Sequence, residues 1–159
     1  MCKNINITAN SSFRNHKNII WHDNIHIGPM AYIWAVSGLR IGENVIFGPR
    51  VTIYTSNHRY ENATMIPYEG YSYAKKVTIE RNVWIGDSTL IVPGVTTGEG
   101  SIVAMGSVVI KDVPKYSIVG GNPVKVIRQR DIEKYKELDA NKMYYMRLKK
   151  ENKVEWKFI

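Results

Sequence analysis

The feature that most constrains the fold of this chain is a six-residue repeat. From residue 79 onward an apolar or small side chain returns at every sixth position, and a second series follows four residues after each member of the first. The first series is Ile79, Ile85, Ile91, Thr97, Val103 and Val109, and the second is Val83, Thr89, Val95, Ser101, Ser107 and Val113. A period of six fits neither the helical repeat of about 3.6 residues nor the alternation of a strand. Because glycine or proline recurs between these positions, the pattern predicts short strands separated by turns.

Three such strands make one triangular coil, and residues eighteen positions apart then stack on each other. The repeat therefore predicts that Ile79 stacks on Thr97 and Ile85 on Val103. Neighbouring coils pair their backbones at the strand spacing of about 4.8 Å. The inward side chains of successive coils form one continuous core, as in other repeat proteins.

The same arrangement extends toward the N-terminus in two weaker blocks. One block has Ile41, Phe47 and Ile53 with Val45, Val51 and Asn57, and the other has Ile27 and Ile33 with Ala31 and Ser37. The registers of the two blocks differ by two residues, which predicts a corner insertion near Ser37–Gly38. A chain of 159 residues supports one such domain, which we place at 1–128, followed by an appendage at 129–159.

The repeat stops at the stretch TSNHRYENATMIPYEG, residues 55–70, and resumes at about Val77. The polar, tyrosine-rich excursion occupies about 59–76, and a long loop in a compact domain is usually functional or disordered. By register Ile53 and Asn57 take inward positions, so His58 falls at the following corner and points outward. Imidazole titrates near neutral pH and can accept a proton from a hydroxyl group, which makes His58 a candidate general base.

Composition limits the class of protein further. The formal net charge of +8 favours polyanionic partners such as phosphate-rich ligands, nucleic acid or acidic saccharides, with much of the excess expected in the last thirty residues. No segment is apolar enough to span a bilayer, and the N-terminus lacks the apolar region of a secretory signal, so we expect a cytoplasmic protein. The single cysteine, Cys2, excludes an intramolecular disulfide and a cysteine-based zinc cluster, and we expect it to be an inert thiol.

Residues 19–128 resemble the hexapeptide-repeat acyltransferases, which are left-handed parallel β-helices. The resemblance depends on NHRY at 57–60, VWIGDSTLIVPGVTTGEGSIVAMGSVVIKDVP at 83–114 and YSIVGGNPVKVIR at 116–128. It implies a β-class fold with left-handed coils, a long excursion loop and a short C-terminal helical segment. It also implies a homotrimer with active sites between subunits that moves an acetyl group from acetyl-CoA to a saccharide hydroxyl without a metal.

The resemblance assigns roles to particular residues. His58 takes the place of the family's catalytic base, and no covalent acyl-enzyme is required. The acceptor residues that we expect are Asn57, Tyr60, Tyr68, Tyr71 and Tyr73, since tyrosines can stack on and hydrogen-bond a sugar. The expected coenzyme residues are Trp84 along the pantetheine arm, Ala104 and Met105 through their main chain, and Lys111, Lys125 and Arg128 at the phosphates. The group that orients His58 is left open among Glu61, Glu69 and Asp87.

Several alternatives remain open. The tyrosines and Trp84 could simply cover the coils, and the basic residues could be solvated surface charge. A zinc hydratase on the same scaffold needs three converging histidines, and His16, His22 and His26 lack a convincing ligand spacing. A non-catalytic solenoid for binding or structure is a different class, while N-acetylation of an amino sugar and antibiotic acetylation are alternatives within the enzyme class. We expect no nucleic-acid partner.

The appendage at 129–159 contains strong helix formers and predicts one helix, or two with a break near Asp139–Asn141. Its simplest role is to cap the last coil or brace a neighbour. Its lysines could instead contact an anionic lipid surface or an acidic polysaccharide, which would suit a lipid-linked acceptor.

Overall fold

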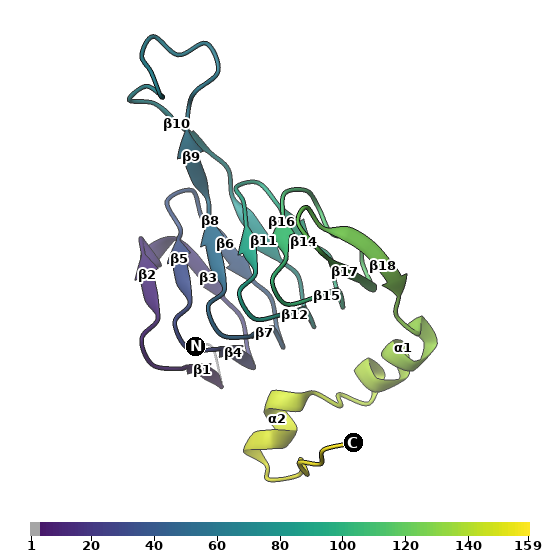
Figure 1. The fold of residues 1–159 in the computed structure, drawn as a ribbon. Helices are drawn as coiled ribbons and strands as arrows, with labels where there is room; N and C mark the ends of the chain where they lie inside the picture. The colour runs from purple at the N-terminus through teal and green to yellow at the C-terminus, as the bar shows by residue number, and fades with distance from the viewer. Residues whose placement is uncertain (1–3) are drawn as a thin grey trace.

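The structure, a computed structural model, describes residues 4–159, so the prediction about Cys2 lies outside the described residues. Three parallel sheets wrap into a triangular prism (Figure 1). Face 1 contains β1 (Ile5–Ile7), β4 (Ile25–Ile27), β7 (Ile46–Phe47), β12 (Trp84–Ile85), β15 (Ile102–Val103) and β17 (Ser117–Gly120). Face 2 contains β2 (Ser12–Arg14), β5 (Tyr32–Trp34), β8 (Thr52–Tyr54), β13 (Leu90–Ile91) and β16 (Val108–Val109). Face 3 contains β3 (Ile19–Trp21), β6 (Leu39–Ile41), β11 (Val77–Ile79) and β14 (Thr96–Thr97).

The strand register confirms the predicted eighteen-residue stacking in the later coils. Ile79 pairs with Thr97 and Ile85 pairs with Val103, each in a parallel ladder. All members of both six-residue series are buried, with at most 3% of any side chain exposed. The fold is the expected left-handed parallel β-helix. In these later coils its core is the predicted set of inward side chains.

The earlier coils are two residues longer, as the shift in register predicted. Ile33 pairs with Ile53, twenty residues away, and Leu39 pairs with Ile19 at the same separation. The extra residues lie at the corner between faces 2 and 3, where Gly38 has a positive φ of 96°. A 3-10 turn at His16–Asn18 occupies the same corner one coil earlier, and the Asn18 side chain donates to the Val36 carbonyl at 2.9 Å.

The prediction that Asn57 points into the prism is wrong. Asn57 is exposed, and the inward position belongs to Thr55, which is fully buried. The Thr55 hydroxyl donates to the Trp34 carbonyl at 3.1 Å and accepts from the Ser37 amide at 2.9 Å. These bonds to the corner of the preceding coil hold Thr55 inside, so the chain leaves the prism two residues earlier than the repeat suggests.

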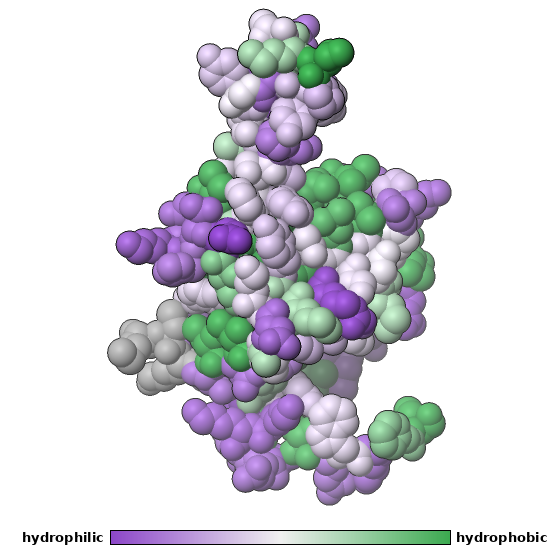
Figure 2. All heavy atoms as spheres, turned by 60° about the vertical axis from the view of Figure 1, so that its left-hand side comes forward, coloured by the Kyte–Doolittle hydropathy of each residue, from purple (hydrophilic) through white to green (hydrophobic). Residues whose placement is uncertain are grey.

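The excursion is an antiparallel hairpin that projects from the corner between faces 2 and 3 (Figure 1). Its strands are β9 (Ser56–His58) and β10 (Ser72–Ala74), so the hairpin begins before the expected loop at 59–76. Met65 and Ile66 lie in the distal part of the hairpin, 64% and 96% exposed, and apolar atoms mark its tip in Figure 2.

A strand at the end of the β-helix leads into the C-terminal appendage, which contains two helices. β18 (Lys125–Gln129) pairs antiparallel with β17, and α1 (Ile132–Ala140) and α2 (Tyr145–Lys150) follow, on the opposite side of the prism from the excursion (Figure 1). The Asp131 side chain caps α1 by accepting from the Lys134 amide. No helix within residues 4–159 is long and apolar enough to cross a membrane.

Candidate active site

His58 ends strand β9 at the base of the hairpin, with its imidazole exposed. Its backbone pairs with Ser72 of β10, and its amide donates to the Asn57 side-chain oxygen at 2.9 Å. The imidazole stacks on the Tyr68 ring, with centroids 3.9 Å apart and planes tilted by 16°. The strand pairing and the stacking together hold a solvent-accessible imidazole in one place.

The His58 pocket lies over face 2 and has a volume of about 300 Å³. Its lining residues are Tyr32, Trp34, Tyr54, Ser56, Asn57, His58 and Ser72. A second, mainly apolar hollow of about 200 Å³ shares Tyr54, Ser56 and Asn57 and adds Leu90, Val92 and Pro93. The two hollows adjoin each other at these shared residues. A molecule bound in the apolar hollow on the outer surface of face 2 could therefore extend to His58.

Three aromatic residues of this pocket were missed by the sequence reasoning. Tyr32 and Trp34 are the outward residues of β5, and Tyr54 is an outward residue of β8. The rings of Tyr32 and Tyr54 lie 5.8 Å apart. The signal was present as aromatic residues at alternate positions of one strand, a pattern that places both side chains on the same side of a sheet.

The four tyrosines expected at the acceptor site have different surroundings. Tyr68 stacks on His58, and Tyr60 is 63% exposed on the hairpin. The Tyr71 ring lies 6.0 Å from the Arg59 guanidinium. The Tyr73 hydroxyl donates to Glu61 at 3.3 Å, and desolvation together with that carboxylate raises the pKa of Tyr73. Of the four, the structure brings only Tyr68 against His58.

The hairpin has an internal scaffold built around Glu69, which is 5% exposed. Arg59 forms an ion pair with Glu69 at 3.0 Å, and the Thr64 amide and hydroxyl both donate to the other carboxylate oxygen at 3.2 Å. Glu61 accepts from Tyr73, and Asp87 pairs with Arg50. Within the described part of the chain, none of these three carboxylates is bonded to the His58 of the same chain.

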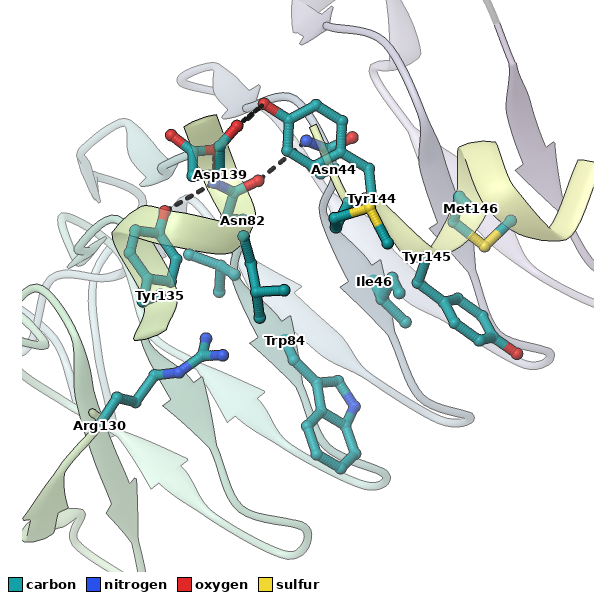
Figure 3. Close-up of a pocket in the computed structure, with 13 residues that line it drawn as sticks. Asn44, Ile46, Asn82, Trp84, Arg130, Tyr135, Asp139, Tyr144, Tyr145 and Met146 are labelled. Carbon is teal, nitrogen blue, oxygen red and sulfur yellow. Dashed lines mark hydrogen bonds between the residues drawn. The ribbon is translucent and has the colours of Figure 1, made fainter. Parts of the chain in front are cut away.

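Trp84 lies on a different face of the prism from His58. It is an outward residue of β12 on face 1, is 52% exposed and lines a pocket of about 220 Å³ beneath the appendage (Figure 3). Ile46, Tyr145 and Met146 line the same pocket. A single chain therefore does not bring His58 and Trp84 into one pocket.

Ala104 and Met105 form the corner between faces 1 and 2. A Cβ on Gly86 would lie 2.5 Å from the Met105 nitrogen, so the two coils approach at this point only because residue 86 is glycine. The Ala104 amide already donates to the Val119 carbonyl at 2.8 Å. Met105 is 76% exposed, which leaves its side chain open to a ligand.

The three predicted phosphate ligands do not share one face. Lys125 and Arg128 are exposed residues of β18, which extends face 1. Lys111 is exposed and lies two residues after the end of β16 of face 2. They can meet one phosphate-bearing molecule only if it contacts two faces or two chains.

A network of polar side chains fastens α1 to the corner between faces 3 and 1. Arg81 donates to both Asp139 oxygens at 2.8 Å. Asn82 donates to Asp139 and to the Tyr135 hydroxyl, the latter bond being visible in Figure 3. Hydrogen bonding from Arg81 lowers the pKa of Asp139, and burial raises the pKa of Tyr135. This paired geometry positions the appendage over the pocket that contains Trp84.

His26 lies on face 1, and burial together with the nearby Lys149 ammonium lowers its pKa. Within residues 4–159 no group of three or more histidine, cysteine, aspartate or glutamate side chains could hold a metal ion.

Comparison with known proteins relates this architecture to one family. Residues 76–111 match the family model described as a hexapeptide repeat of succinyl-transferase. The chain is 37% identical over 138 residues to galactoside O-acetyltransferase of Escherichia coli, a match that covers 83% of this chain and 62% of that protein. The matches span 48 to 62% of the length of the first curated relatives.

Two solved structures show the same relationship. A maltose O-acetyltransferase from Clostridium difficile is 32% identical with a TM-score of 0.65, covering 82% of this chain and 69% of that chain. A hexapeptide-repeat acetyltransferase from Vibrio cholerae, in complex with acetyl-CoA, is 30% identical with a TM-score of 0.61, covering 79% and 64%. The chain belongs to the hexapeptide-repeat acetyltransferase family.

Proposed function

We propose that this protein transfers an acetyl group from acetyl-CoA to a saccharide hydroxyl, with His58 as general base. The observation that carries the proposal is the exposed imidazole, held by β-pairing and by Tyr68 at the mouth of an aromatic pocket. Aromatic rings and hydroxyl groups suit the faces and edges of a sugar ring. The O-acetyltransferases among its relatives support the choice of acceptor.

The transfer takes place in one complex of donor and acceptor. His58 accepts the proton of the acceptor hydroxyl while the oxygen forms a bond to the thioester carbonyl carbon. The carbon–sulfur bond then breaks, and the coenzyme leaves as a thiol with the proton that His58 held. Backbone amides near the thioester would stabilise the oxyanion that forms between these steps.

The complete site is shared between subunits of a homotrimer. The outward side chains of four neighbouring strands of face 1 form an apolar row. The row consists of Ile46, Trp84, Ile102 and Ile118, which are in register. Leu90, Val92 and Val108 give face 2 an apolar outer surface as well. If face 1 of one subunit packs on face 2 of the next, Trp84 approaches the His58 pocket of its neighbour. The same packing brings Lys125 and Arg128 toward Lys111 across the interface.

His58→Ala tests the proposed base. Turnover, measured as thiol release with saccharide acceptors, is expected to fall at least about a hundredfold, since general-base catalysis contributes that much. Acetyl-CoA binding by calorimetry is expected to persist. His22→Ala is the matched control, because His22 lies in a separate polar groove with Arg40 and Glu43.

Two results would contradict the proposal: near-normal turnover of His58→Ala, or failure of the parent protein to bind acetyl-CoA. The rival reaction, N-acetylation of an amino sugar, predicts a steep rise of rate toward alkaline pH without a requirement for His58. The pH–rate profile of the variant therefore separates the two reactions.

A further inference from the structure

Five exposed cations follow the corner between faces 2 and 3, from which the hairpin projects. They are Arg14 and Lys17 on the N-terminal side, Lys75 and Lys76 at the base of the hairpin, and Lys111 on the C-terminal side. None of the five forms an ion pair with another residue of the described chain 4–159. By contrast Arg50, Arg59, Arg81 and Lys115 are all paired with carboxylates.

This distribution corrects the expectation that the C-terminal tail holds much of the excess charge. Residues 129–159 contain nine basic and six acidic side chains, whereas residues 1–128 contain thirteen and eight. The larger share of the +8 net charge therefore belongs to the β-helix. Of the eight cations of residues 4–128 that form no ion pair in the described structure, five lie at the corner that carries His58.

Three of these cations form what we call the N-terminal basic cluster: Arg14, Lys17 and Lys76. A Cβ on Gly38 would lie 3.8 Å from both the Asn18 carbonyl oxygen and the Lys76 Cγ, so Lys76 lies beside the turn that contains Lys17. The Lys75 side chain instead lies over Gly94, 3.0 Å from such a Cβ, on the side of Lys111. Lys75 and Lys111, which lie nearer the expected position of the coenzyme phosphates, are thus on the other side of the hairpin base from the N-terminal basic cluster.

The N-terminal basic cluster leads directly to the His58 pocket. Arg14 is in register with Trp34, and Trp34 with Tyr54, in the parallel ladder of face 2. At about 4.8 Å per coil, Arg14 lies about 10 Å from the row of Tyr54. Both aromatic residues line the pocket of His58. On the N-terminal side of the pocket, the row of aromatic rings is therefore followed by the unpaired cation Arg14 and the rest of the cluster.

We propose that the N-terminal basic cluster binds acid groups of the acceptor, and that the acceptor is an acidic saccharide chain. Sugar rings stack on Trp34 and Tyr54, while carboxylates of the same chain lie against the cluster. The inference rests on the proposed acetyl transfer for its choice of a saccharide over another polyanion. It goes beyond that transfer because it specifies the charge of the acceptor and its direction along the prism.

The test measures binding of fluorescein-labelled polygalacturonate by anisotropy, without acetyl-CoA. The parent protein is expected to bind it at low salt, to release it as salt increases and to bind neutral dextran of equal length far more weakly. Combined Arg14→Gln, Lys17→Gln and Lys76→Gln substitutions are expected to weaken polygalacturonate binding about tenfold, because exposed ion pairs are individually weak and three are removed. Retaining the charge, with Arg14→Lys, Lys17→Arg and Lys76→Arg, is expected to preserve binding.

The matched control combines Lys136→Gln, Lys142→Gln and Lys150→Gln, three exposed cations of the appendage. An equal loss in this control would overturn the proposal, because net charge alone would then explain binding. Equal binding of neutral dextran, or equal cluster-dependent binding of a single-stranded oligonucleotide, would also overturn it.

Acetyl-CoA affinity separates this proposal from the proposed function. The cluster variant is expected to bind acetyl-CoA within about twofold of the parent, since an exposed charge beyond the reach of a ligand is screened. A large loss would assign the cluster to the donor and overturn the inference. If the parent binds polygalacturonate but transfers no acetyl group, the proposed function fails while the polyanion surface stands.

Discussion

Subunit complementation gives the sharpest test of a shared active site. His58 lies on the hairpin at the corner between faces 2 and 3, whereas Trp84 is an outward residue of face 1 that lines a different pocket. His58→Ala and Trp84→Ala are each expected to be nearly inactive as homotrimers. In a mixed trimer, however, an intact His58 meets an intact Trp84 at one interface.

The expected activity follows from counting interfaces in a cyclic trimer. In the proposed trimer, each of the three interfaces would combine His58 of one subunit with Trp84 of the next. A trimer with two subunits of one variant and one of the other has one interface in which both residues are intact. Mixed trimers are therefore expected to show about one third of wild-type activity per trimer, whichever variant is in the majority.

The assay uses co-expression with two different affinity tags, so that tandem purification retains only mixed trimers. Thiol release from acetyl-CoA is measured with a saccharide acceptor under saturating donor. The matched control co-expresses wild type with the double variant His58→Ala/Trp84→Ala. A shared site predicts about one sixth of wild-type activity for equal amounts of the two mixed trimers, whereas a site within one chain predicts about one half.

A shared active site is refuted if tandem-purified mixtures of the single variants are no more active than either parent variant. In that case His58 and Trp84 serve one chain, or Trp84 has no part in the reaction. Light scattering that shows a monomer under assay conditions would refute it independently.

Two further predictions concern stability. Thr97 and Thr89 are both buried in the prism, but the Thr97 hydroxyl has no hydrogen-bond partner in the described structure, whereas the Thr89 hydroxyl donates to the Gly86 carbonyl at 2.9 Å. Thr97→Val is therefore expected to raise the free energy of unfolding by about 1 kcal/mol, and Thr89→Val to lower it by about 1 kcal/mol. Denaturant titrations at one protein concentration measure both changes. A change of the same sign in both variants would contradict this prediction. Burial and the nearby Lys149 lower the pKa of His26 in the folded chain. The unfolded chain therefore takes up a proton near pH 6.5 that the folded chain does not yet bind. The free energy of unfolding is consequently highest above that pH and decreases below it. His26→Asn is expected to reduce the drop in Tm between pH 7.5 and about pH 5, and an unchanged drop would show that His26 does not contribute.

The core could be predicted from the sequence because every coil repeats the same steric requirement. An inward position must hold a small or β-branched side chain of suitable volume, and the neighbouring coils impose the same spacing on it. Thr97 and Ser101 fit this rule although they are polar, since both are fully buried. The shift near Ser37–Gly38 was visible for the same reason, because it interrupts an otherwise constant spacing.

The candidate site was less predictable because it depends on residues that leave the repeat. Asn57 was misplaced because Thr55 forms hydrogen bonds with the preceding corner, and no spacing in the sequence reports such a bond. The aromatic pocket was missed because outward positions of a β-helix carry no repeating constraint. The contact of Asn82 with Asp139 joins residues that are 57 positions apart, and only the folded chain brings them together.

The location of the site follows from where a parallel β-helix can accept extra residues. Each inner strand pairs with a strand on both sides, so an insertion within a strand would break two ladders, whereas an insertion at a corner breaks none. The corner between faces 2 and 3 accepts the turn at His16–Asn18, the two residues near Gly38 and the hairpin at 56–74. Because successive coils stack, these insertions lie beside one another. The same corner can therefore gather an exposed histidine, an aromatic pocket and unpaired cations without any change to the core.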